Sequence, residues 1–499
     1  MFKNISKDKS IILFWDMAEE YEKGEKYLIY MDGRLFAETE KTHFTIEELT
    51  PETEYSVRVV YGGKSEELIG EAKIKTEKIR KRINVCDAPY FAKGDGKTLN
   101  TKALQAAIDS CGKGEQVYIP KGDFMTGSLR LHSDMELYIE EGAILHGTTV
   151  VDDYKPKIKS RFEGIEMMCY SALLNIGELD RDGDYNCKNV RICGGGTVCG
   201  GGRELAENVI EVEKVLLADY MKSLGDKILE CENMQTIPGR PRPRLINMSN
   251  AQNIVIENIT VQNGACWNVH MIYSDNITTC GCTFRSEKVW NGDGWDPDSS
   301  TNCTLFDCHF YTGDDAVAIK SGKNPEGNVV NKPCEHIRVF DCVSHFGHGI
   351  TIGSEMSGGV NDVKIWDCDM ATSVYGVEIK GTKKRGGYVK NVHVKNCSVC
   401  RILMHSVGYN DDGEAAPTVP VFKDCTFENI HISAVAHDKD GGRVPCDAIE
   451  LLGFDTAENY IDNVKFKNIS IAENPDTHKQ TIALSYCKGV SFENIYCGE

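Results

Sequence analysis

The stretch that decides the fold is a recurring triplet, which reads Phe306-Asp-Cys308, Phe340-Asp-Cys342 and Trp366-Asp-Cys368. Each copy follows a short strand-like run and puts an acidic residue or its amide before Cys or Ile. Five further copies occupy Ile256-Glu-Asn-Ile259, Lys395-Asn-Cys397, Lys423-Asp-Cys425, Phe466-Lys-Asn-Ile469 and Phe492-Glu-Asn-Ile495, and Cys282 fits the spacing between Ile259 and Cys308.

The spacing of these copies predicts an all-β solenoid with one copy per coil. Successive copies stand 23, 26, 34, 26, 29, 28, 44 and 26 residues apart. A period of about 20–30 residues, rich in strands and without crossover helices, is typical of a parallel β-helix, in which each repeat buries its apolar face against the next. The spacings of 34 and 44 predict coils that carry loop insertions.

The same repeat accounts for many of the 21 cysteines without any chemistry. A free Cys packs as a small buried hydrophobe, and here it recurs at one position of the coil. Cys397-Ser-Val-Cys400 has the CxxC spacing, but the sequence offers no second pair at metal-ligand spacing. We therefore expect neither zinc nor redox chemistry there.

The overall charge excludes one class of partner. The chain has 56 basic and 75 acidic residues, which gives a formal charge of −19 at pH 7. Nucleic-acid binding needs a basic face, so we expect no nucleic-acid partner.

No run reaches the ~18 apolar residues of a membrane span, and no apolar core of a signal peptide follows Met1. With the odd number of cysteines, these features favour a cytoplasmic protein; a secreted one would need a leader that had been removed.

Residues 1–78 predict a small β-sandwich. Short strand-like runs alternate with turns, and Asp32-Gly33 is a hairpin signal. The segment from Leu49 to Val59 resembles the fibronectin type III signature, with Tyr55 placed for a tyrosine corner. We interpret this domain as a spacer or docking module, and the basic run Lys78-Ile-Arg-Lys-Arg82 as a linker.

The second domain is predicted to cover residues 84–499. It opens at Gly94-Asp-Gly-Lys-Thr98, after which Thr101 can cap a helix whose apolar face contains Leu104 and Ile108. The charged segment 203–227 is predicted to be an exposed helix or a long loop.

Three glycine-flanked blocks carry the candidate chemistry: Asn291-Gly-Asp293, Gly313-Asp-Asp315 and Gly347-His-Gly349. Glycine lets the backbone and a ligand approach closely. Carboxylates that converge on one cleft can supply the acid and the base that cleave a glycosidic bond. Equivalent positions on neighbouring coils stack ~4.8 Å apart, so the three blocks are predicted to meet on one surface.

Strand alternation predicts which side chains face outward beside these blocks. In Gly376-Val-Glu-Ile-Lys380 it turns Glu378 and Lys380 to the same outer face, and in Ala316-Val-Ala-Ile-Lys320 it exposes Lys320. Asp314 and Asp315 would point to opposite faces of a regular strand. For both to reach the cleft, they must lie at a strand start or a bend.

Taken together, these blocks resemble glycoside hydrolase family 28, the polygalacturonase family. The resemblance covers about residues 84–499 and includes Arg242-Pro-Arg-Leu-Ile246 and Trp267-Asn-Val-His270. It implies a right-handed parallel β-helix and inverting hydrolysis without metal or cofactor.

The same resemblance implies roles for single residues. Asp314 matches the general acid, Asp293 and Asp315 match the pair that activates water, and His348 tunes their protonation. Lys380 matches a lysine that binds a galacturonate carboxylate, and Lys320 is a second candidate for substrate binding. His270 is expected to be structural, and Asp296 and Asp298 are expected to brace the coil beneath Asp293.

One departure from the family pattern concerns the substrate. Glu378 stands where the family usually has an arginine, which would grip a carboxylate through a bidentate fork. Either Arg385 substitutes for that cation, or the sugar in this subsite is not plain galacturonate. A smaller departure is Gly292, where the family typically has threonine.

These observations predict an exo-acting hydrolase of α-linked galacturonic acid in pectin-derived oligosaccharides. The N-terminal module and the insertion Gly408–Pro417 could close one end of the cleft. The alternatives are a hydrolase of xylogalacturonan or rhamnogalacturonan fragments, a Ca²⁺-dependent pectate lyase, and a non-catalytic carbohydrate-binding solenoid. The oligomeric state is left open.

Overall fold

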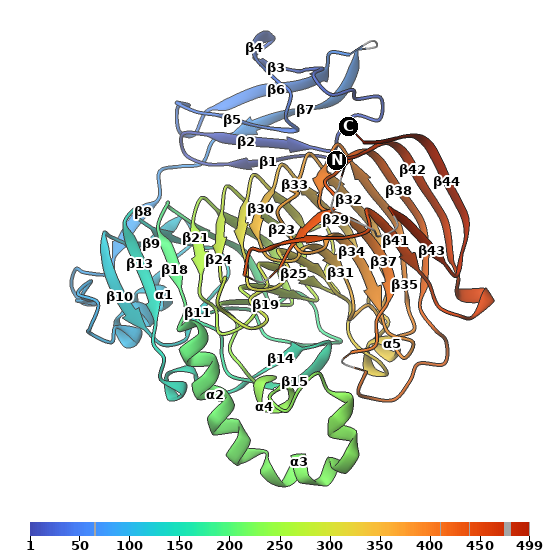
Figure 1. Cartoon of the computed structure of the whole chain (residues 1–499). Coiled ribbons are helices and arrows are strands. Elements are labelled where there is room, and N and C mark those ends of the chain that lie inside the picture. Colours follow the sequence, from blue (N-terminus) through green and yellow to red (C-terminus); the bar gives the residue numbers. More distant parts are fainter. Residues whose placement is uncertain (64–65, 410, 439, 474–480, 499) are drawn as a thin grey trace. The chain divides into compact units, whose positions relative to one another are not determined.

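The computed structural model describes residues 1–498 except 64–65, 410, 439 and 474–480. The chain forms two compact units: Met1–Arg82 with Gly114–Gln116, and Ile83–Lys113 with Val117–Glu499 (Figure 1). The predicted linker is partly a strand, because β8 begins at Lys81. Among the described residues, no helix is both long and apolar enough to cross a membrane.

The first unit is an antiparallel β-sandwich, as predicted. Its described strands form one sheet in the order β1-β2-β5 and another in the order β4-β3-β6-β7. Asp32 and Gly33 both have positive φ and form the two-residue turn between β3 and β4, which is the geometry such hairpins favour. The strands are β1 (Phe2–Ser6), β2 (Ile11–Trp15), β3 (Tyr27–Met31), β4 (Arg34–Thr39), β5 (His43–Ile46), β6 (Glu54–Tyr61) and β7 (Glu67–Lys75).

The tyrosine of this sandwich lies as the sequence predicts. The Tyr55 hydroxyl accepts a hydrogen bond from the Thr50 backbone N–H, five residues upstream, at 3.0 Å. Such a bond from a tyrosine back to the preceding corner is the hallmark of a tyrosine corner. The relationship to fibronectin type III domains stays a prediction.

The second unit is a parallel β-helix. Figure 1 shows its coils stacked side by side in sequence order, from cyan to red. One face is a sheet that comprises, in the described part of the chain, β11 (Leu129–Leu131), β16 (Leu174–Ile176), β19 (Ile246–Ser249), β22 (Val269–Ile272), β25 (Trp295–Asp298), β28 (Val317–Ile319), β31 (Gly349–Ile352), β34 (Gly376–Gly381), β37 (Ile402–Ser406), β41 (Ile449–Leu452) and β43 (Ile482–Ser485).

The other two faces belong to a second parallel sheet. One run of it contains β12 (Met135–Ile139), β17 (Cys187–Cys193), β20 (Ala251–Glu257), β23 (Asp275–Cys280), β26 (Thr304–Phe306), β29 (Cys334–Phe340), β32 (Val360–Trp366), β35 (Tyr388–Lys395), β38 (Val421–Ile432), β42 (Ile461–Ile471) and β44 (Cys487–Cys497). A second run contains β10 (Gly122–Thr126), β13 (Ala143–Gly147), β18 (Thr197–Cys199), β21 (Thr260–Gln262), β24 (Thr283–Arg285), β27 (His309–Tyr311), β30 (Val343–Phe346), β33 (Asp369–Met370) and β36 (Ser398–Val399), while β8 (Lys81–Asn84) and β9 (Glu115–Ile119) complete the sheet.

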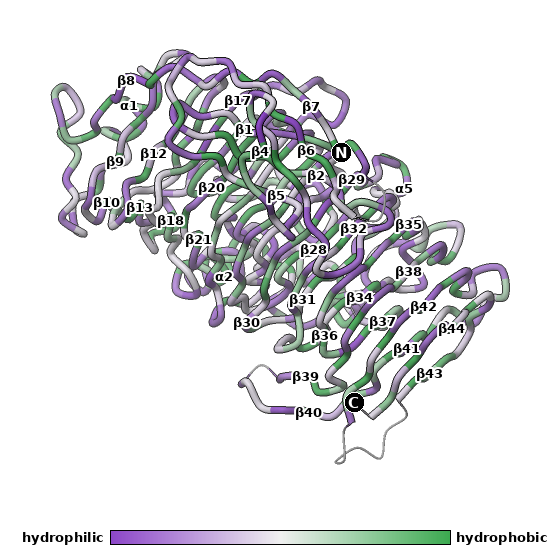
Figure 2. Tube along the Cα trace, turned by 90° about the horizontal axis from the view of Figure 1, so that it is seen from above, coloured by the Kyte–Doolittle hydropathy of each residue, from purple (hydrophilic) through white to green (hydrophobic). Residues whose placement is uncertain are grey.

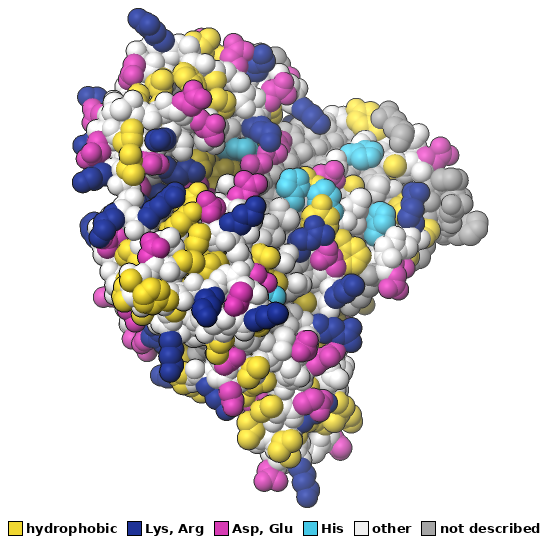
Figure 3. All heavy atoms as spheres, turned by 90° about the vertical axis from the view of Figure 1, so that its left-hand side faces the viewer, with side chains coloured by type: hydrophobic (Ala, Val, Ile, Leu, Met, Phe, Trp, Pro, Cys, Tyr) yellow, Lys and Arg dark blue, Asp and Glu magenta, His cyan; other side chains and the backbone are white. Residues whose placement is uncertain are grey.

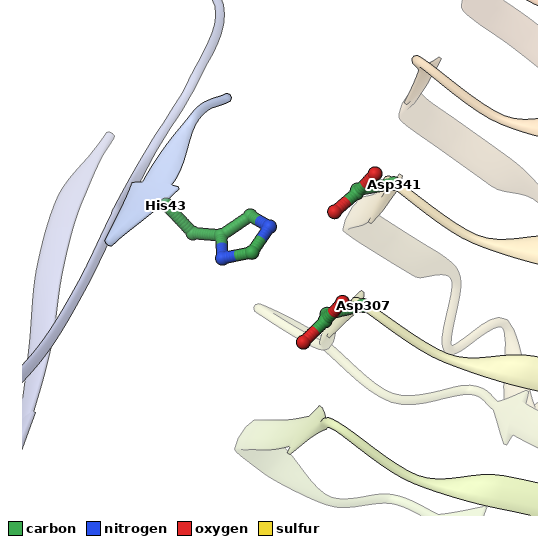
Figure 4. A group of neighbouring side chains, drawn as sticks. All are labelled: His43, Asp307 and Asp341. Carbon is green, nitrogen blue, oxygen red and sulfur yellow. The ribbon is translucent and has the colours of Figure 1, made fainter. Parts of the chain in front are cut away.

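The Asp or Asn of the repeat turns the chain between two faces. These residues adopt the left-handed conformation, as at Asp307 (φ 54°) and Asp341 (φ 49°), and short polar side chains tolerate it best after glycine. Figure 4 shows Asp307 and Asp341 at the same place on successive coils; it also draws His43, a residue of β5 in the first unit. The repeat is therefore set by the corner that each coil requires.

One copy of the repeat was assigned to the wrong position. Asn396 accepts a side-chain hydrogen bond from Asn429 at 3.0 Å, and Lys395 pairs with Glu428 in the ladder. The equivalent of Lys395-Asn-Cys397 is therefore Glu428-Asn-Ile430. The triplet at Lys423-Asp-Cys425 lies at another corner of the same coil, because Val392 pairs with Cys425. A local triplet cannot distinguish two corners that need the same residue type.

The coil interior is apolar, and hydrophobic and hydrophilic residues alternate along the strands (Figure 2). Cys282, Cys308, Cys342, Cys368 and Cys397 are buried at one position of consecutive coils, as the repeat predicts. None of the 21 cysteines forms a disulfide in the described structure.

Helices and hairpins decorate the coils. Helix α1 (Thr101–Ser110) buries Leu104 and Ile108 as predicted, but Asn100 occupies the cap position and Thr101 is the first helical residue. The charged segment forms α2 (Gly202–Leu216) and α3 (Ala218–Leu224). The remaining elements are α4 (Thr236–Gly239), α5 (Glu326–Val330), η1 (Val151–Tyr154), η2 (Gly225–Glu230), η3 (Ala457–Asn459) and the hairpins β14 (Ile158–Phe162) with β15 (Ile165–Cys169) and β39 (Val435–His437) with β40 (Arg443–Pro445).

Candidate active site

The sheet that begins with β11 brings the three predicted blocks together. Trp295, Val317 and Ile350 pair in register on β25, β28 and β31. Asp293, Asp315 and His348 each lie two residues before these paired residues, so they occupy the same position on three consecutive coils. The backbone N–H of His348 donates a hydrogen bond to the carbonyl of Asp314 at 2.9 Å. Residues 55 positions apart in the sequence thereby become neighbours.

Glycines permit this close approach of the coils. A side chain at Gly313 would place its Cβ 2.3 Å from the carbonyl oxygen of Val289, and one at Gly347 would meet Thr312 Oγ1 at 2.3 Å. Gly347 also has a φ of 117°, which side chains rarely allow. Asp314 and Asp315 lie in the bend before β28, as the alternation argument requires, and both line one pocket.

His348 lies between the two adjacent aspartates. Its Nδ1 is 2.8 Å from Asp314 Oδ1 and 3.3 Å from Asp315 Oδ1. Burial alone would lower the pKa of His348, but the two carboxylates outweigh it and raise that pKa well above its usual value. Burial would raise the pKa of Asp315, yet Lys380, His348 and Lys320 lower it. Asp315 is thus held ionised, and Thr351 Oγ1 donates to it at 2.7 Å.

Asp293 occupies a different electrostatic environment. Lys320 Nζ lies 3.0 Å from Asp293 Oδ2 and 2.7 Å from Asp296 Oδ1, and it stacks 3.5 Å above the ring of Trp267. Burial raises the pKa of Asp293 well above its usual value, although Lys320 opposes the shift. Burial likewise raises the pKa of Asp296, to about 6. Asp293 Oδ1 has no hydrogen-bond partner among the described residues, so it is the oxygen that a bound molecule would meet.

A second buried network supports the floor of the site. Asp298 Oδ1 accepts from Arg161 at 2.6 Å, and its Oδ2 lies 3.4 Å from His270 Nε2. All three side chains are almost fully buried. His270 and Asp298 therefore brace the site and do not face a ligand, as the sequence predicts. Asp296 is braced in the same way through Lys320.

The pocket around these groups has a volume of about 320 Å³, at the lower end of the range for small-molecule sites. In the described part of the chain its lining contains six carboxylates and two lysines, in addition to His348. Acidic and basic side chains are interspersed over the molecular face drawn in Figure 3. The lining residues are Glu163, Glu232, Trp267, Trp290, Asn291, Asp293, Asp314, Asp315, Lys320, His348, Gly353, Ser354, Glu355, Tyr375, Lys380 and Tyr409.

Glu378 and Arg385 differ from the expectation of direct substrate contact. Arg385 is fully buried, and its guanidinium donates to Asn324 Oδ1 at 2.6 Å and to the Ser354 carbonyl at 3.0 Å. Glu378 is only 2% exposed and pairs with Lys380 at 2.8 Å. Neither is among the pocket-lining residues that the structure describes. Lys320 and Lys380 do line the pocket, but each already has a carboxylate partner.

Sequence reasoning missed several residues of the lining. Tyr375 pairs in register with the position of His348, one coil further on, so the repeat could have identified it. Glu163 lies in the β14–β15 turn, a position that carries no signal in the sequence. Tyr409 lies in the loop before β38, within the insertion Gly408–Pro417 that was predicted to close one end of the cleft.

The site also has the geometry of a possible cation site. Asp314, Asp315 and His348 offer ligand atoms that all lie within 4.8 Å of one another. The same three atoms are already partners in the ion pairs described above. The expectation of a metal-free site stays a prediction.

Comparisons with known proteins agree with this architecture. The family model described as Glycosyl hydrolases family 28 matches residues 111–483. An exo-poly-alpha-D-galacturonosidase of Dickeya chrysanthemi is 25% identical over 98% of this chain and 89% of its own. A probable polygalacturonase of Vitis vinifera is 31% identical over 68% of each chain. The solved structure of a family 28 exopolygalacturonase of Yersinia enterocolitica superposes with a TM-score of 0.77 at 23% identity, covering 100% of this chain and 99% of that one.

The neutral, buried state of His270 predicts a pH-dependent stability. Burial lowers the pKa of His270 to about 3, although Asp298 opposes the shift. The unfolded chain binds a proton at this ring near pH ~6.5, whereas the folded chain does not until about pH 3. The contribution of the neutral His270 ring to the free energy of unfolding is fully present above pH ~6.5. It is lost as the pH falls from there towards about 3. When the pH is lowered from ~7 to ~5, we expect the free energy of unfolding to fall by about 2 kcal/mol less in His270→Gln than in the parent chain. Denaturant titrations at both pH values measure the difference; equal losses would contradict the assignment.

Proposed function

We propose that this chain, which belongs to the glycosyl hydrolases family 28, releases galacturonic acid by inverting hydrolysis from one end of pectin-derived oligosaccharides. As a member of that family it is a glycoside hydrolase. The observation that carries the proposal is the convergence of Asp293, Asp314, Asp315 and His348 in one pocket of sugar size.

The reaction needs one acid and one base on opposite sides of the scissile bond. In the proposal Asp314 donates a proton to the leaving oxygen, and His348 holds it in position. Asp293 and Asp315 activate the water that attacks the anomeric carbon, which inverts the configuration. Two features support this division: Asp315 is held ionised by its neighbours and can accept a proton from water, and Asp293 Oδ1, which has no partner among the described residues, can hold that water in place.

Ion pairs between insertions beside the pocket support exo action. Asp412 of the loop before β38 pairs with Arg240, which follows α4, at 2.8 Å, and also with Lys323. Arg240 in turn pairs with Glu163 in the β14–β15 turn at 2.9 Å. This charge cluster (Glu163, Arg240, Asp412 and Lys323) joins three insertions beside the pocket. They are the β14–β15 hairpin, the segment that contains α4, and the loop before β38. Of the predicted insertion Gly408–Pro417, Asn410 lies outside the described residues.

The names of two relatives support the same reaction. The Dickeya chrysanthemi relative, which this chain matches over almost its full length, carries the name of an exo-acting galacturonosidase. The Vitis vinifera relative is named as a probable polygalacturonase. Both names point to galacturonic acid, and the first points to release from a chain end.

Product analysis on defined oligogalacturonides tests the proposal. We expect release of saturated galacturonic acid from one end, with inverted anomeric configuration by NMR, and loss of activity by at least about 100-fold in Asp314→Asn. Asp455→Asn, which removes a carboxylate from an exposed pair with Lys383, is the matched control.

Other outcomes identify the alternatives. An unsaturated product that requires Ca²⁺ would identify a lyase, and fragments of many lengths at early times would identify endo action. If every uronide substrate stays intact while sugars still bind, the chain is a carbohydrate-binding solenoid and the proposal is wrong.

The charge cluster predicts a second mutational effect. Asp412→Asn leaves Arg240 and Lys323 without their shared counter-ion, so the loop that carries Tyr409 loses one of its anchors. Because misplaced binding groups slow catalysis sharply, we expect kcat/KM on a short oligosaccharide to fall about 10- to 100-fold. Steady-state kinetics measure it, together with a thermal melt that confirms folding. Unchanged kinetics would mean that the cluster does not shape the pocket.

We also propose a cytoplasmic location. None of the 21 cysteines forms a disulfide in the described structure, which suits a reducing compartment better than an oxidising one. Fractionation of cells that produce the full chain tests this, and activity found outside the cell would contradict it.

A further inference from the structure

One end of the pocket is built around Lys380. Its Nζ lies 5.8 Å from the ring centre of Tyr375 and 5.9 Å from that of Tyr409. All three residues line the pocket. Aromatic rings offer apolar faces to the C–H surfaces of a pyranose, and the lysine offers hydrogen-bond donors. We call this end the Lys380 subsite, defined by Tyr375, Lys380 and Tyr409.

The positive charge of Lys380 is neutralised by Glu378, which is not among the described pocket-lining residues. Glu378 Oε2 lies 2.8 Å from Lys380 Nζ, and Oε1 lies 2.7 Å from His405 Nε2. Thr351 Oγ1 adds a 3.5 Å contact to Oε2. Burial would raise the pKa of Glu378, but Lys380 and His405 lower it, so the carboxylate is ionised. Glu378 is thus a fixed counter-ion that a ligand cannot reach.

The other positive charges of the described pocket lining already have carboxylate partners, and His348 lies against Asp314 and Asp315. Lys320, the other lysine of the described lining, is already shared by Asp293 and Asp296. Six carboxylates line the same space. A carboxylate on a sugar bound at Lys380 would therefore meet a lysine whose charge Glu378 already offsets, in a pocket that Asp315 and five other carboxylates line. Juxtaposed like charges in a poorly solvated site are costly.

We propose that the Lys380 subsite takes an uncharged pyranose. The inference rests on the proposed function and sharpens its substrate: a terminal galacturonic acid α-linked to a neutral sugar or to an esterified uronic acid. Lys380 donates hydrogen bonds to hydroxyl or ester oxygens of that sugar. Glu378 is a positioning residue, which fixes the lysine and cancels its charge.

Three substrates with the same terminal galacturonic acid test the inference. In the first the adjoining unit is galacturonic acid, in the second its methyl ester, and in the third rhamnose. We expect kcat/KM to be at least about tenfold higher for the second or the third than for the first, a difference of about 1.4 kcal/mol. The two uncharged substrates distinguish an esterified uronide from a neutral sugar as the natural occupant.

Variants of Glu378 connect the preference to the residue. In Glu378→Gln we expect the preference for the uncharged over the charged substrate to fall at least about tenfold, through a lower KM for the charged one. The matched control is Glu450→Gln, because Glu450 lies 3.8 Å from the other nitrogen of His405, two coils on, and does not contact Lys380 in the described structure. Because the preference is a ratio of two kcat/KM values measured on one preparation, it does not depend on how much of that preparation is folded.

The outcomes separate this inference from the proposed function. If digalacturonic acid is cleaved as fast as the uncharged substrates, the inference is wrong and the proposed function stands. The inference is also wrong if Glu378→Gln and Glu450→Gln leave the same preference. If none of the three substrates is cleaved, the proposed function fails and the inference falls with it.

Discussion

Parallel hydrogen bonding between successive coils is the constraint on which the rest of this structure depends. Each strand of the β-helix pairs in register with the strand one coil earlier, so each position of a coil lies above its equivalent. The ladder converts sequence spacing into spatial adjacency at ~4.8 Å per coil. Asp and Asn corners in the left-handed conformation keep the coils in register, because a slipped corner would put a bulkier side chain there. The site contains one row of such equivalent positions, which lie just before β25, β28 and β31.

Stacking also brings buried charges together, and their pairing decides what the pocket can bind. Asp293 and Asp296 share Lys320, Asp314 and Asp315 share His348, and Glu378 neutralises Lys380. Removing such groups from water is tolerated only because each has a partner. The same pairing uses up the cations that an anionic substrate would need. The folded site is therefore rich in carboxylates, although the sequence places Lys320, Lys380 and Arg385 beside it.

Local patterns predicted the architecture and the convergence of Asp293, Asp315 and His348 on one row, for physical reasons that act over short distances. The Phe-Asp-Cys triplets predicted a parallel β-helix because each coil needs one buried residue after one left-handed corner. Strand alternation placed Glu378 and Lys380 on the same outer face, and they form an ion pair there. The misassigned copy at Asp424 shows the limit of this reasoning. Two corners of one coil need the same residue type, and only strand register tells them apart.

By itself the sequence determined the β-helix, the N-terminal sandwich and the row that contains Asp293, Asp315 and His348, because these follow from periodicity and from steric rules for single residues. Only the tertiary structure decided which charges face the pocket. It buried Arg385 behind the wall, gave Lys380 a permanent counter-ion, and brought Glu163 and Tyr409 to the pocket from distant insertions. Electrostatic partnership depends on distances across the fold, and no local pattern encodes those distances.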